Sequence, residues 1–543
     1  MSSLVFRILL LSCASVFCLT AKEPAPPQVT KFAQYRVWLE KKELAVSNLF
    51  TATGYGYQKL PVSYVDVSQD GTPEFVVETE EPITTFEWSP RPPGVVPVVK
   101  DNQLHFRPGD APSKLGVRLN NHQWLFLFLN RPDPSRPSAG TPGVISLDKY
   151  GADATGKRVE TATLQKAIDD AATEGKPTTV FIPHGIYRTG SLWMKSNVTL
   201  YLDDGAILQG EESDDAYPMI PYEHQAQWDA STDPQCHRAL LWFHGIHDAA
   251  LRGRGVLDGQ GSLRRDAYRG KISASDPRTH NIRVVDCERI RLEDVVVRDS
   301  EFWGIHLLRS RDIGIQNIKI VNEMIYPGWD IKNPKSRWNN TDGLDVDACA
   351  RVTIEDSFAY TGDDAFVIKT TNTGPTQPPP CEDILFRRCM GAASTMAFKF
   401  GTESVASAMR RITFEDLDVP AMNGAISLGF KTRDTATVEQ IVFRKIRLAN
   451  PDNWLSVLVE GRTPEQKDFV KIRDLSFEEI DLPKSPKGIL KGRKDTDSLS
   501  GIHFYKMKVT GKAVTSLSEM GLQCTDAAEI TIDGKPAPGP DSH

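Results

Sequence analysis

The chain has 543 residues and a formal net charge of −7, from 64 lysines and arginines and 71 aspartates and glutamates. This length allows a large hydrophobic core and more than one domain. Acidic and basic residues are interspersed along the chain, so the sequence lacks the basic surface that a nucleic-acid partner requires.

The first 21 residues have the pattern of a secretory signal peptide. Arg7 precedes an apolar run from Ile8 to Leu19, and the small residue Ala21 follows it. This pattern is typical of a cleaved signal rather than a membrane span. We therefore expect a secreted, periplasmic or cell-surface protein that does not span the membrane.

Residues 29–130 predict an antiparallel β-sandwich domain. Short segments with alternating apolar residues, such as 74–78 and 124–129, are separated by turns rich in glycine and proline. Residues 131–143 then contain four prolines and two glycines, which is typical of an extended linker. We place a domain boundary in this linker.

The segment that follows the linker predicts one amphipathic helix. Leu164, Ala167, Ile168 and Ala171 recur at helical spacing, and Gly175 follows them as a C-cap. Because the helix precedes many predicted strands, we expect it to cover the open end of a β-helix, where core residues and strand edges would otherwise be exposed.

A short pattern is repeated seven times in the remainder of the chain. Each copy alternates apolar and polar residues, so that one side of a strand faces a core and the other faces solvent. The spacing suits the coils of a solenoid with loops inserted between them. The copies lie at residues 290–295, 313–318, 352–357, 384–389, 412–417, 441–446 and 475–480. We therefore predict a parallel β-helix over residues 144–537.

The cysteines and histidines do not predict a metal site. Six cysteines follow residue 21, and none of them forms a Cys-x-x-Cys pair, so neither a zinc site nor a dense disulfide framework is indicated. Several should be small buried residues on the coil walls. His244 and His247 lack an accompanying group of carboxylates. We predict no cofactor and no metal.

Three aspartates within the repeat region are the strongest candidates for catalysis. Asp342 and Asp363 are 21 residues apart, about one coil, so equivalent positions would lie roughly 4.8 Å apart along the stack. Asp364 adds a third carboxyl group. Carboxylates this close repel each other when ionised, which raises the pKa of at least one and lets it act as a general acid. The alternative is that they are solvated turn residues. Asp345 and Asp347, at alternate positions of one strand, are expected to be outward-facing structural acids, with one of them lining the groove as the alternative.

The motifs in this region resemble those of the polygalacturonase (pectinase) family of glycoside hydrolases. The resemblance covers about residues 144–448 and is specific at the two aspartate motifs. The matching segments, in order, are Tyr150-Gly151-Ala152-Asp153, residues 181–187, residues 257–261, residues 299–303, Asn340-Thr341-Asp342-Gly343 and Gly362-Asp363-Asp364. It implies an all-β protein with a right-handed parallel β-helix.

The resemblance also implies an inverting mechanism. Asp363 would protonate the leaving oxygen, while Asp342 and Asp364 would position and deprotonate the attacking water. Inversion needs room for this water, so we expect acid and base carboxyl groups roughly 6.5 to 9.5 Å apart.

Two motifs of that family are incomplete in this chain. The family's Gly-His-Gly segment falls near residues 394–397, where no histidine is present, and its Arg-x-Lys motif has Gly429 in place of the arginine. Lys431 is kept, and Arg433 could compensate for the arginine. We predict Lys431, Arg433 and Lys399 as substrate-binding residues, although a strand lysine is more often merely solvated.

The substrate stays open between two kinds of polysaccharide. Pectin, either galacturonan or rhamnogalacturonan, is favoured, but a β-sandwich ahead of the β-helix resembles the dextranase and isopullulanase family, which acts on α-glucan. Trp303, Trp329 and Trp338 are predicted to stack on sugar rings, with loop packing as the alternative. Asn340, beside the catalytic motif, is also predicted to bind substrate.

Two other classes of protein fit parts of the sequence. A polysaccharide lyase on the same fold would need a basic residue and often calcium, which an Asp-Asp pair could bind. A non-catalytic carbohydrate-binding β-helix would be expected to have lost some of the acids. We favour a hydrolase that acts as a monomer on a polysaccharide.

Overall fold

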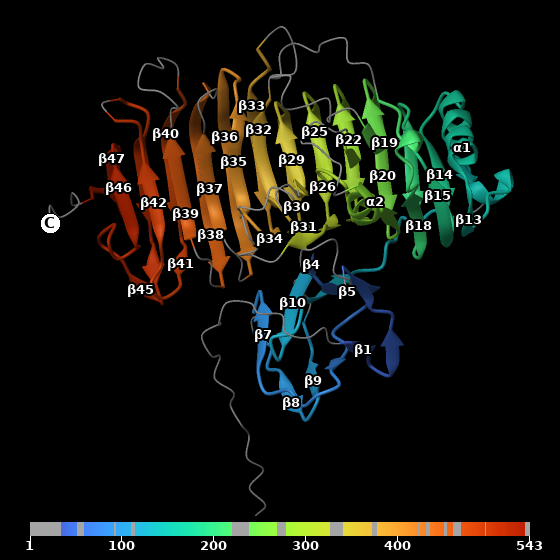
Figure 1. The fold of residues 1–543 in the computed structure, drawn as a ribbon, viewed down its shortest axis with the longest axis horizontal. Helices are drawn as coiled ribbons and strands as arrows, with labels where there is room; N and C mark the ends of the chain where they lie inside the picture. Colours follow the sequence, from blue (N-terminus) through green and yellow to red (C-terminus); the bar gives the residue numbers. More distant parts are fainter. Residues whose placement is uncertain are drawn as a thin grey trace, which may run out of the picture.

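The protein consists of an elongated β-helix with a smaller β-domain attached to one side, as the computed structural model shows (Figure 1). The structure describes residues 34–50, 59–91, 94–109, 114–138, 140–219, 238–268, 278–325, 340–371, 377–420, 424–430, 435–449, 453–459, 469–494 and 496–537. The predicted signal peptide at residues 1–21 lies outside these ranges. None of the described helices is long and apolar enough to cross a lipid bilayer.

The N-terminal domain is a β-sandwich of two five-stranded sheets that share one core. One sheet has the order β2-β1-β6-β9-β8, and the other has the order β3-β5-β11-β10-β7, in which β5 and β11 are parallel and the other pairs are antiparallel. The strands are β1 (Arg36–Leu39), β2 (Lys42–Leu44), β3 (Ser47–Leu49), β5 (Val62–Ser68), β6 (Phe75–Glu78), β7 (Phe86–Ser89), β8 (Val98–Lys100), β9 (Gln103–Phe106), β10 (Lys114–Leu119) and β11 (Leu125–Asn130).

The strand β11 is buried on both faces because it belongs to two cores. Leu125 and Leu127 face the core of the sandwich, whereas Phe126 and Phe128 face the β-helix. The Phe126 and Phe128 rings lie 4.6 and 5.0 Å from the ring of Phe358, measured between centroids. This aromatic contact fixes the sandwich against the side of the solenoid.

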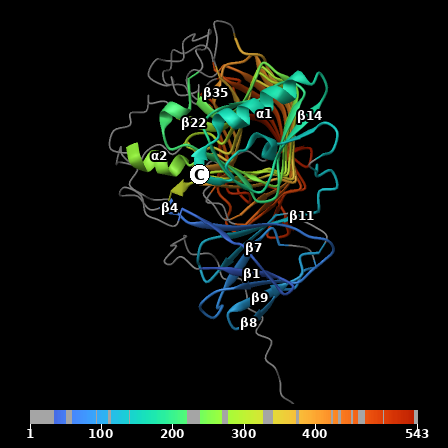
Figure 2. The same cartoon turned by 90° about the vertical axis from the view of Figure 1, so that its right-hand side faces the viewer.

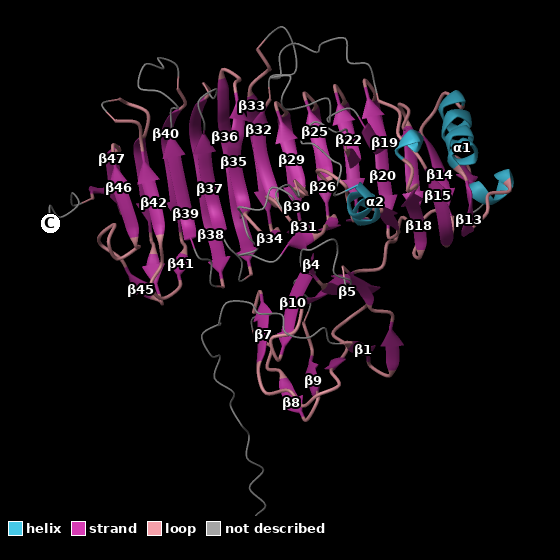
Figure 3. Ribbon diagram, in the orientation of Figure 1, coloured by secondary structure: helices cyan, strands magenta, loops and turns pink. Residues whose placement is uncertain are grey.

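The β-helix has two long parallel sheets that run along its whole length (Figures 1 and 3). The sheet that carries the candidate site has eleven strands: β16 (Leu192–Trp193), β19 (Arg238–His244), β22 (Thr279–Val285), β25 (Ile305–Leu308), β29 (Leu344–Asp347), β32 (Phe366–Thr370), β35 (Met396–Ser404), β37 (Gly424–Phe430), β39 (Asn453–Val459), β42 (Gly488–Lys491) and β46 (Leu522–Thr525).

The second sheet of the β-helix has 25 strands, most of which pair in parallel with strands of the neighbouring coils. They are β12 (Val144–Ser146), β13 (Thr155–Val159), β14 (Thr178–Ile182), β15 (Gly185–Thr189), β17 (Val198–Leu202), β18 (Ala206–Gly210), β20 (His247–Gly253), β21 (Val256–Asp258), β23 (Glu288–Glu293), β24 (Val296–Arg298), β26 (Arg311–Gln316), β27 (Lys319–Val321), β30 (Ala350–Glu355), β31 (Phe358–Thr361), β33 (Cys381–Arg387), β34 (Met390–Ala393), β36 (Ala408–Val419), β38 (Thr437–Leu448), β40 (Lys471–Glu478), β41 (Asp481–Leu482), β43 (Ser500–Tyr505), β44 (Lys508–Val509), β45 (Lys512–Ala513), β47 (Ala528–Ile532) and β48 (Lys535–Pro536).

Few helices accompany the strands in the part of the chain that the structure describes. They are α1 (Thr161–Thr173), α2 (Gly261–Tyr268) and the 3-10 turns Leu147–Tyr150 and Asp214–Ala216. A short antiparallel pair also joins the two domains, between β4 (Lys59–Leu60) of the sandwich and β28 (Met324–Ile325) of the β-helix.

The seven repeated patterns lie on adjacent strands and in register, as the sequence predicts. Val352 pairs with Ile384, Ile384 with Ile412, and Ile412 with Ile441. The apolar residues of each copy face one continuous core, because parallel pairing places equivalent positions on the same side. Cys287, Cys349, Cys381 and Cys389 are buried free thiols of these coils, which also agrees with expectation.

The helix α1 covers the first coils of the β-helix, as predicted (Figure 2). Its residues Leu164, Ala167, Ile168 and Ala171 are buried in the main core. The segment between the two domains is held along the β-helix: Asp133 accepts a hydrogen bond of 2.8 Å from the Tyr201 hydroxyl, and the Arg136 guanidinium pairs with both oxygens of Asp203.

A ladder of stacked phenylalanines stabilises the C-terminal half of the core. Phe386, Phe414, Phe443, Phe477 and Phe504 lie on neighbouring strands, with ring centroids 4.6 to 5.4 Å apart. Stacked aromatic pairs contribute beyond the area that they bury.

We expect Phe443→Leu to lower the free energy of unfolding by about 1–2 kcal/mol, because it removes two stacking contacts and changes the shape of a packed site. Thermal melts followed by circular dichroism measure this effect. The exposed Tyr505 on β43 provides the control substitution Tyr505→Leu. An equal loss of stability in both variants would contradict a role for the ladder.

Candidate active site

The three aspartates lie where successive coils enter the eleven-stranded sheet. Asp342 precedes β29, and Asp363 and Asp364 precede β32. Leu344 pairs with Phe366, so Asp342 is level with Asp364 rather than with Asp363. The Gly343 amide donates to the Asp364 carbonyl at 2.9 Å, which fixes this register. The coil is therefore one residue longer than the spacing that we assumed from the sequence.

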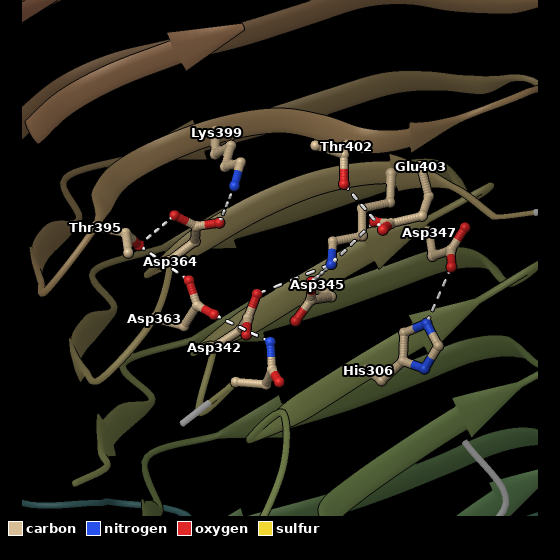
Figure 4. Close-up of polar contacts among 12 residues, drawn as sticks. His306, Asp342, Asp345, Asp347, Asp363, Asp364, Thr395, Lys399, Thr402 and Glu403 are labelled. Atoms are coloured by element: carbon tan, nitrogen blue, oxygen red, sulfur yellow. Dashed lines mark hydrogen bonds and ion pairs between the residues drawn. The ribbon is translucent and has the colours of Figure 1, made fainter. Parts of the chain in front are cut away.

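The carboxyl groups of Asp342, Asp363 and Asp364 converge on one place (Figure 4). One oxygen from each lies within 4.8 Å of the others. This is closer than the 6.5 to 9.5 Å that we expected for acid and base. Asp342 and Asp364 are close because they are level on adjacent coils, one strand spacing apart, and Asp363 is close because it is the chain neighbour of Asp364.

Burial and mutual repulsion keep protons on this cluster. The pKa of Asp342 is raised well above its usual range by burial and then by the charges of Asp363 and Asp345. Burial also raises the pKa of Asp363, and the neighbouring Asp364 carboxylate raises it further. In the free protein the cluster therefore binds protons at a higher pH than separate aspartates do, as a general acid requires.

Asp364 is held by three donors from the next coil. The Thr395 hydroxyl donates to Oδ1, the Met396 amide donates to the same oxygen at 3.1 Å, and Lys399 Nζ donates to Oδ2 at 2.5 Å. Such donors favour the ionised form of a carboxylate. Lys399 thus contacts the acid cluster directly, although its side chain is still 22% exposed.

A second lysine, which sequence reasoning missed, lies among the acids. The buried Lys369 Nζ is 3.3 Å from Asp345 Oδ1, 3.5 Å from Glu403 Oε2 and 3.9 Å from Asp342 Oδ2. Burial opposes a charge on Lys369, but these carboxylates raise its pKa well above the usual value. The sequence did contain a sign of this contact. At residues 366–369 a lysine follows three apolar residues, and a lysine buried in such a strand needs carboxylate partners.

The position of Trp303 differs from our prediction that it stacks on a sugar ring. Its side chain is 6% exposed, and Lys369 Nζ lies 3.8 Å from its ring centroid. Phe302 stacks against the ring at 4.9 Å. The tryptophan therefore holds the buried cation of the acid cluster, because the face of an aromatic ring attracts a positive charge.

The acids Asp345 and Asp347 are buried rather than outward, and each has a positively charged or donor partner. Asp345 pairs with Lys369, and its pKa is raised to about 7, mainly by burial. Asp347 lies 3.2 Å from His306 Nε2 and accepts from the Thr371 amide at 2.8 Å. Burial lowers the pKa of His306 to about 4, so this histidine is neutral at physiological pH.

Asn340 lies beside the acids, and the remaining predicted binding residues fall outside the described ranges. Asn340 Nδ2 donates to Asp363 Oδ2 at 3.2 Å, and its own Oδ1 accepts from Arg278 at 3.1 Å. It therefore orients the candidate acid. The residues outside the described ranges are Lys431, Arg433, Trp329 and Trp338.

One side of the cluster, at Asp363, reaches the surface. Asp342 and Asp364 are each only 2% exposed, but Asp363, Asn340 and Thr395 are half-buried, and the Glu403 side chain is 34% exposed. Three converging acid oxygens could also hold a divalent cation, but Lys369 and Lys399 already supply positive charge beside them. The arrangement suits acid–base chemistry on a bound molecule.

Clustered carboxyl groups beside one sheet of a parallel β-helix are of the kind that a glycoside hydrolase uses for acid–base chemistry. A family model described as Glycosyl hydrolases family 28 matches residues 219–534, and one described as Rhamnogalacturonase A/epimerase, pectate lyase-like matches residues 144–209. The chain belongs to glycosyl hydrolase family 28. The resemblance seen in the motifs is thereby confirmed.

Curated relatives agree with this membership. The chain is 25% identical over 297 residues to a probable polygalacturonase of Vitis vinifera, covering 53% of this chain and 56% of that protein. It is 23% identical over 270 residues to an exo-poly-alpha-D-galacturonosidase of Dickeya chrysanthemi, covering 42% of each. The chain thus spans about half the length of the curated relatives it matches.

The fold is similar to that of two solved enzymes. The family 28 exopolygalacturonase of Yersinia enterocolitica aligns with a TM-score of 0.53 and 15% identity, covering 87% of this chain and 100% of that chain. The polygalacturonase of Erwinia carotovora ssp. carotovora aligns with a TM-score of 0.52 and 16% identity, covering 75% and 100%. At these identities the likeness shows the fold alone.

Proposed function

We propose that this protein is a secreted hydrolase that cleaves the α-linked galacturonan of pectin with inversion at the anomeric carbon. The observation that carries the proposal is the convergence of Asp342, Asp363 and Asp364 within 4.8 Å, in a member of family 28. The curated relatives it matches are named polygalacturonases or galacturonosidases, which favours pectin over α-glucan.

In the proposed mechanism Asp363 is the general acid. It is the most accessible of the three acids, and its raised pKa lets it carry a proton to the leaving oxygen. Asp342 and Asp364 hold the attacking water. Two hydrogen bonds of about 2.8 Å each let one water bridge oxygens separated by up to roughly 5.5 Å, so the observed spacing suits this role.

The substrate is tested by measuring reducing ends released from galacturonan, rhamnogalacturonan and dextran. We expect galacturonan to be cleaved fastest, since the matched curated relatives are named polygalacturonases or galacturonosidases. Release of reducing ends from dextran alone would support an α-glucan hydrolase instead. A product absorbing in the ultraviolet would indicate the unsaturated sugar that a lyase forms.

The stereochemical outcome is tested by proton NMR of the first product formed from a short galacturonan. Single displacement yields the β-anomer first, which then mutarotates. If the α-anomer appears first, a carboxylate acts as a nucleophile, and the role of Asp342 and Asp364 in holding water is wrong.

Export is tested separately from catalysis. Expression of the full chain and mass spectrometry of the protein recovered outside the cytoplasm should give a new N-terminus near residue 22. Retention of the intact N-terminus inside the cell would contradict a cleaved signal.

A further inference from the structure

The segment that carries Thr395 and Lys399 occupies the place where the family's Gly-His-Gly motif is expected, and it contains no histidine. It lies at the start of β35, one coil beyond the Asp-Asp pair. All three donors to Asp364 come from this one segment: the Thr395 hydroxyl, the Met396 amide and Lys399 Nζ. The segment therefore contacts the acids although it lacks the histidine of that motif.

The Thr395 hydroxyl touches both aspartates of the pair. It donates to Asp364 Oδ1 and also lies 3.1 Å from Asp363 Oδ1. A hydroxyl has one proton to donate and lone pairs with which to accept. When its proton is directed to Asp364, the contact with Asp363 is a hydrogen bond only if Asp363 carries a proton and donates it to Thr395 Oγ1.

Lys399 determines which way the hydrogen bonds between Asp363, Thr395 and Asp364 run. Its Nζ is 2.5 Å from Asp364 Oδ2, so the positive charge lies beside Asp364 and stabilises the ionised form of that residue. The Met396 amide, which can only donate, favours the same state. The other charged groups near the pair are Asp342, Asp345, Lys369, Glu403 and, through Asn340, Arg278.

We propose that Thr395 and Lys399 are positioning residues that fix Asp364 as the carboxylate and Asp363 as the protonated member of the pair, in place of the absent histidine. This inference rests on the proposed hydrolase function, and it replaces our expectation that Lys399 binds substrate. The positioning itself makes and breaks no bond: the proton stays on Asp363 until it passes to the leaving oxygen, which keeps the electron pair of the broken glycosidic bond.

The test uses the full chain and the variants Lys399→Met, Lys399→Arg and Thr395→Val. With Lys399→Met we expect kcat on galacturonan to fall about 10- to 100-fold with little change in KM, because the acid pair loses its alignment. The acidic limb of the pH profile should move to higher pH by about one pH unit, because a base without its cation ionises later. Lys399→Arg should restore the acidic limb.

Thr395→Val keeps the size of the side chain and removes the hydroxyl that links the two aspartates. We expect a similar fall in kcat without a change in KM. Lys471→Met, at an exposed lysine paired with Asp497 at 3.2 Å, is the matched control and should leave both constants unchanged. A rise in KM for Lys399→Met, with kcat and the acidic limb unchanged, would instead make Lys399 a substrate-binding residue and overturn the proposal.

Melting temperatures test the positioning role independently of the proposed hydrolase function. The loss of melting temperature in Lys399→Met relative to wild type should grow from pH 5 to pH 8, because ionised Asp364 is then buried without its cation. A loss independent of pH would overturn the positioning role even if the protein cleaves galacturonan. If the wild type releases no reducing ends while the pH-dependent loss is present, the proposed function fails and the pairing stands.

Discussion

Replacing Asp363 with asparagine is expected to reduce kcat on galacturonan by about 10²- to 10⁴-fold, the range typical for loss of a general acid. The substitution keeps the size of the side chain and can still meet Asn340 and Thr395, which contact the two carboxyl oxygens of Asp363. KM should therefore change little. The melting temperature should hold or rise, since burial already favours the neutral form of this group. Reducing-end assays and thermal melts measure both effects.

A matched control is Asp383→Asn on the opposite sheet. Asp383 is exposed and pairs with Arg411 at 2.6 Å, away from the acid cluster. We expect wild-type kcat for this variant. Activity near the wild-type level in Asp363→Asn would remove Asp363 from the role of acid, and equal losses in both variants would point to a general effect on folding.

Replacing Lys369 with methionine is expected to lower the free energy of unfolding by about 3–5 kcal/mol, because it leaves buried carboxyl groups without their cation. Lys369 is the shared partner of Asp345, Glu403 and Asp342. We also expect loss of activity, since Asp342 is one of the three acids of the proposed mechanism. Denaturant titration and thermal melts at fixed pH measure the change in stability.

The titration of Asp345 determines how the loss of stability in Lys369→Met depends on pH. Its pKa is about 7 in the folded protein, mainly because of burial, against about 3.9 in an unfolded chain. Because the folded protein binds this proton more tightly than the unfolded chain does, Asp345 contributes stability that is fully present below about pH 4 and is lost as the pH rises through 7. Without Lys369 the folded-state pKa rises further, so the variant should differ more from wild type at pH 8 than at pH 5.

The double variant Lys369→Met with Asp345→Asn tests the physical cause. Removing the carboxylate together with the cation should restore part of the lost stability and flatten its pH dependence. If the double variant is as unstable as the two single losses added together, the pairing of Lys369 with Asp345 is not the reason for the defect.

The sequence by itself determined the solenoid, its capping helix and the three aspartates. The seven repeated patterns have a period of two within each copy, and parallel stacking is the arrangement that buries all their apolar residues on one side. Leu164, Ala167, Ile168 and Ala171 were enough to predict α1 and its buried face. These are local patterns, so a single sequence contains them.

The tertiary structure alone decided which groups meet across coils. The register that makes Asp342 level with Asp364, the cation of Lys369 over Trp303, and the donors from Thr395 and Lys399 all depend on loop lengths between strands. The second buried face of β11 is partly of this kind: the continuous apolar run at residues 124–129 indicates that both faces are covered, but it does not say which segment covers the second face. Pairwise contacts between distant segments are set by packing, which periodicity within one segment does not encode.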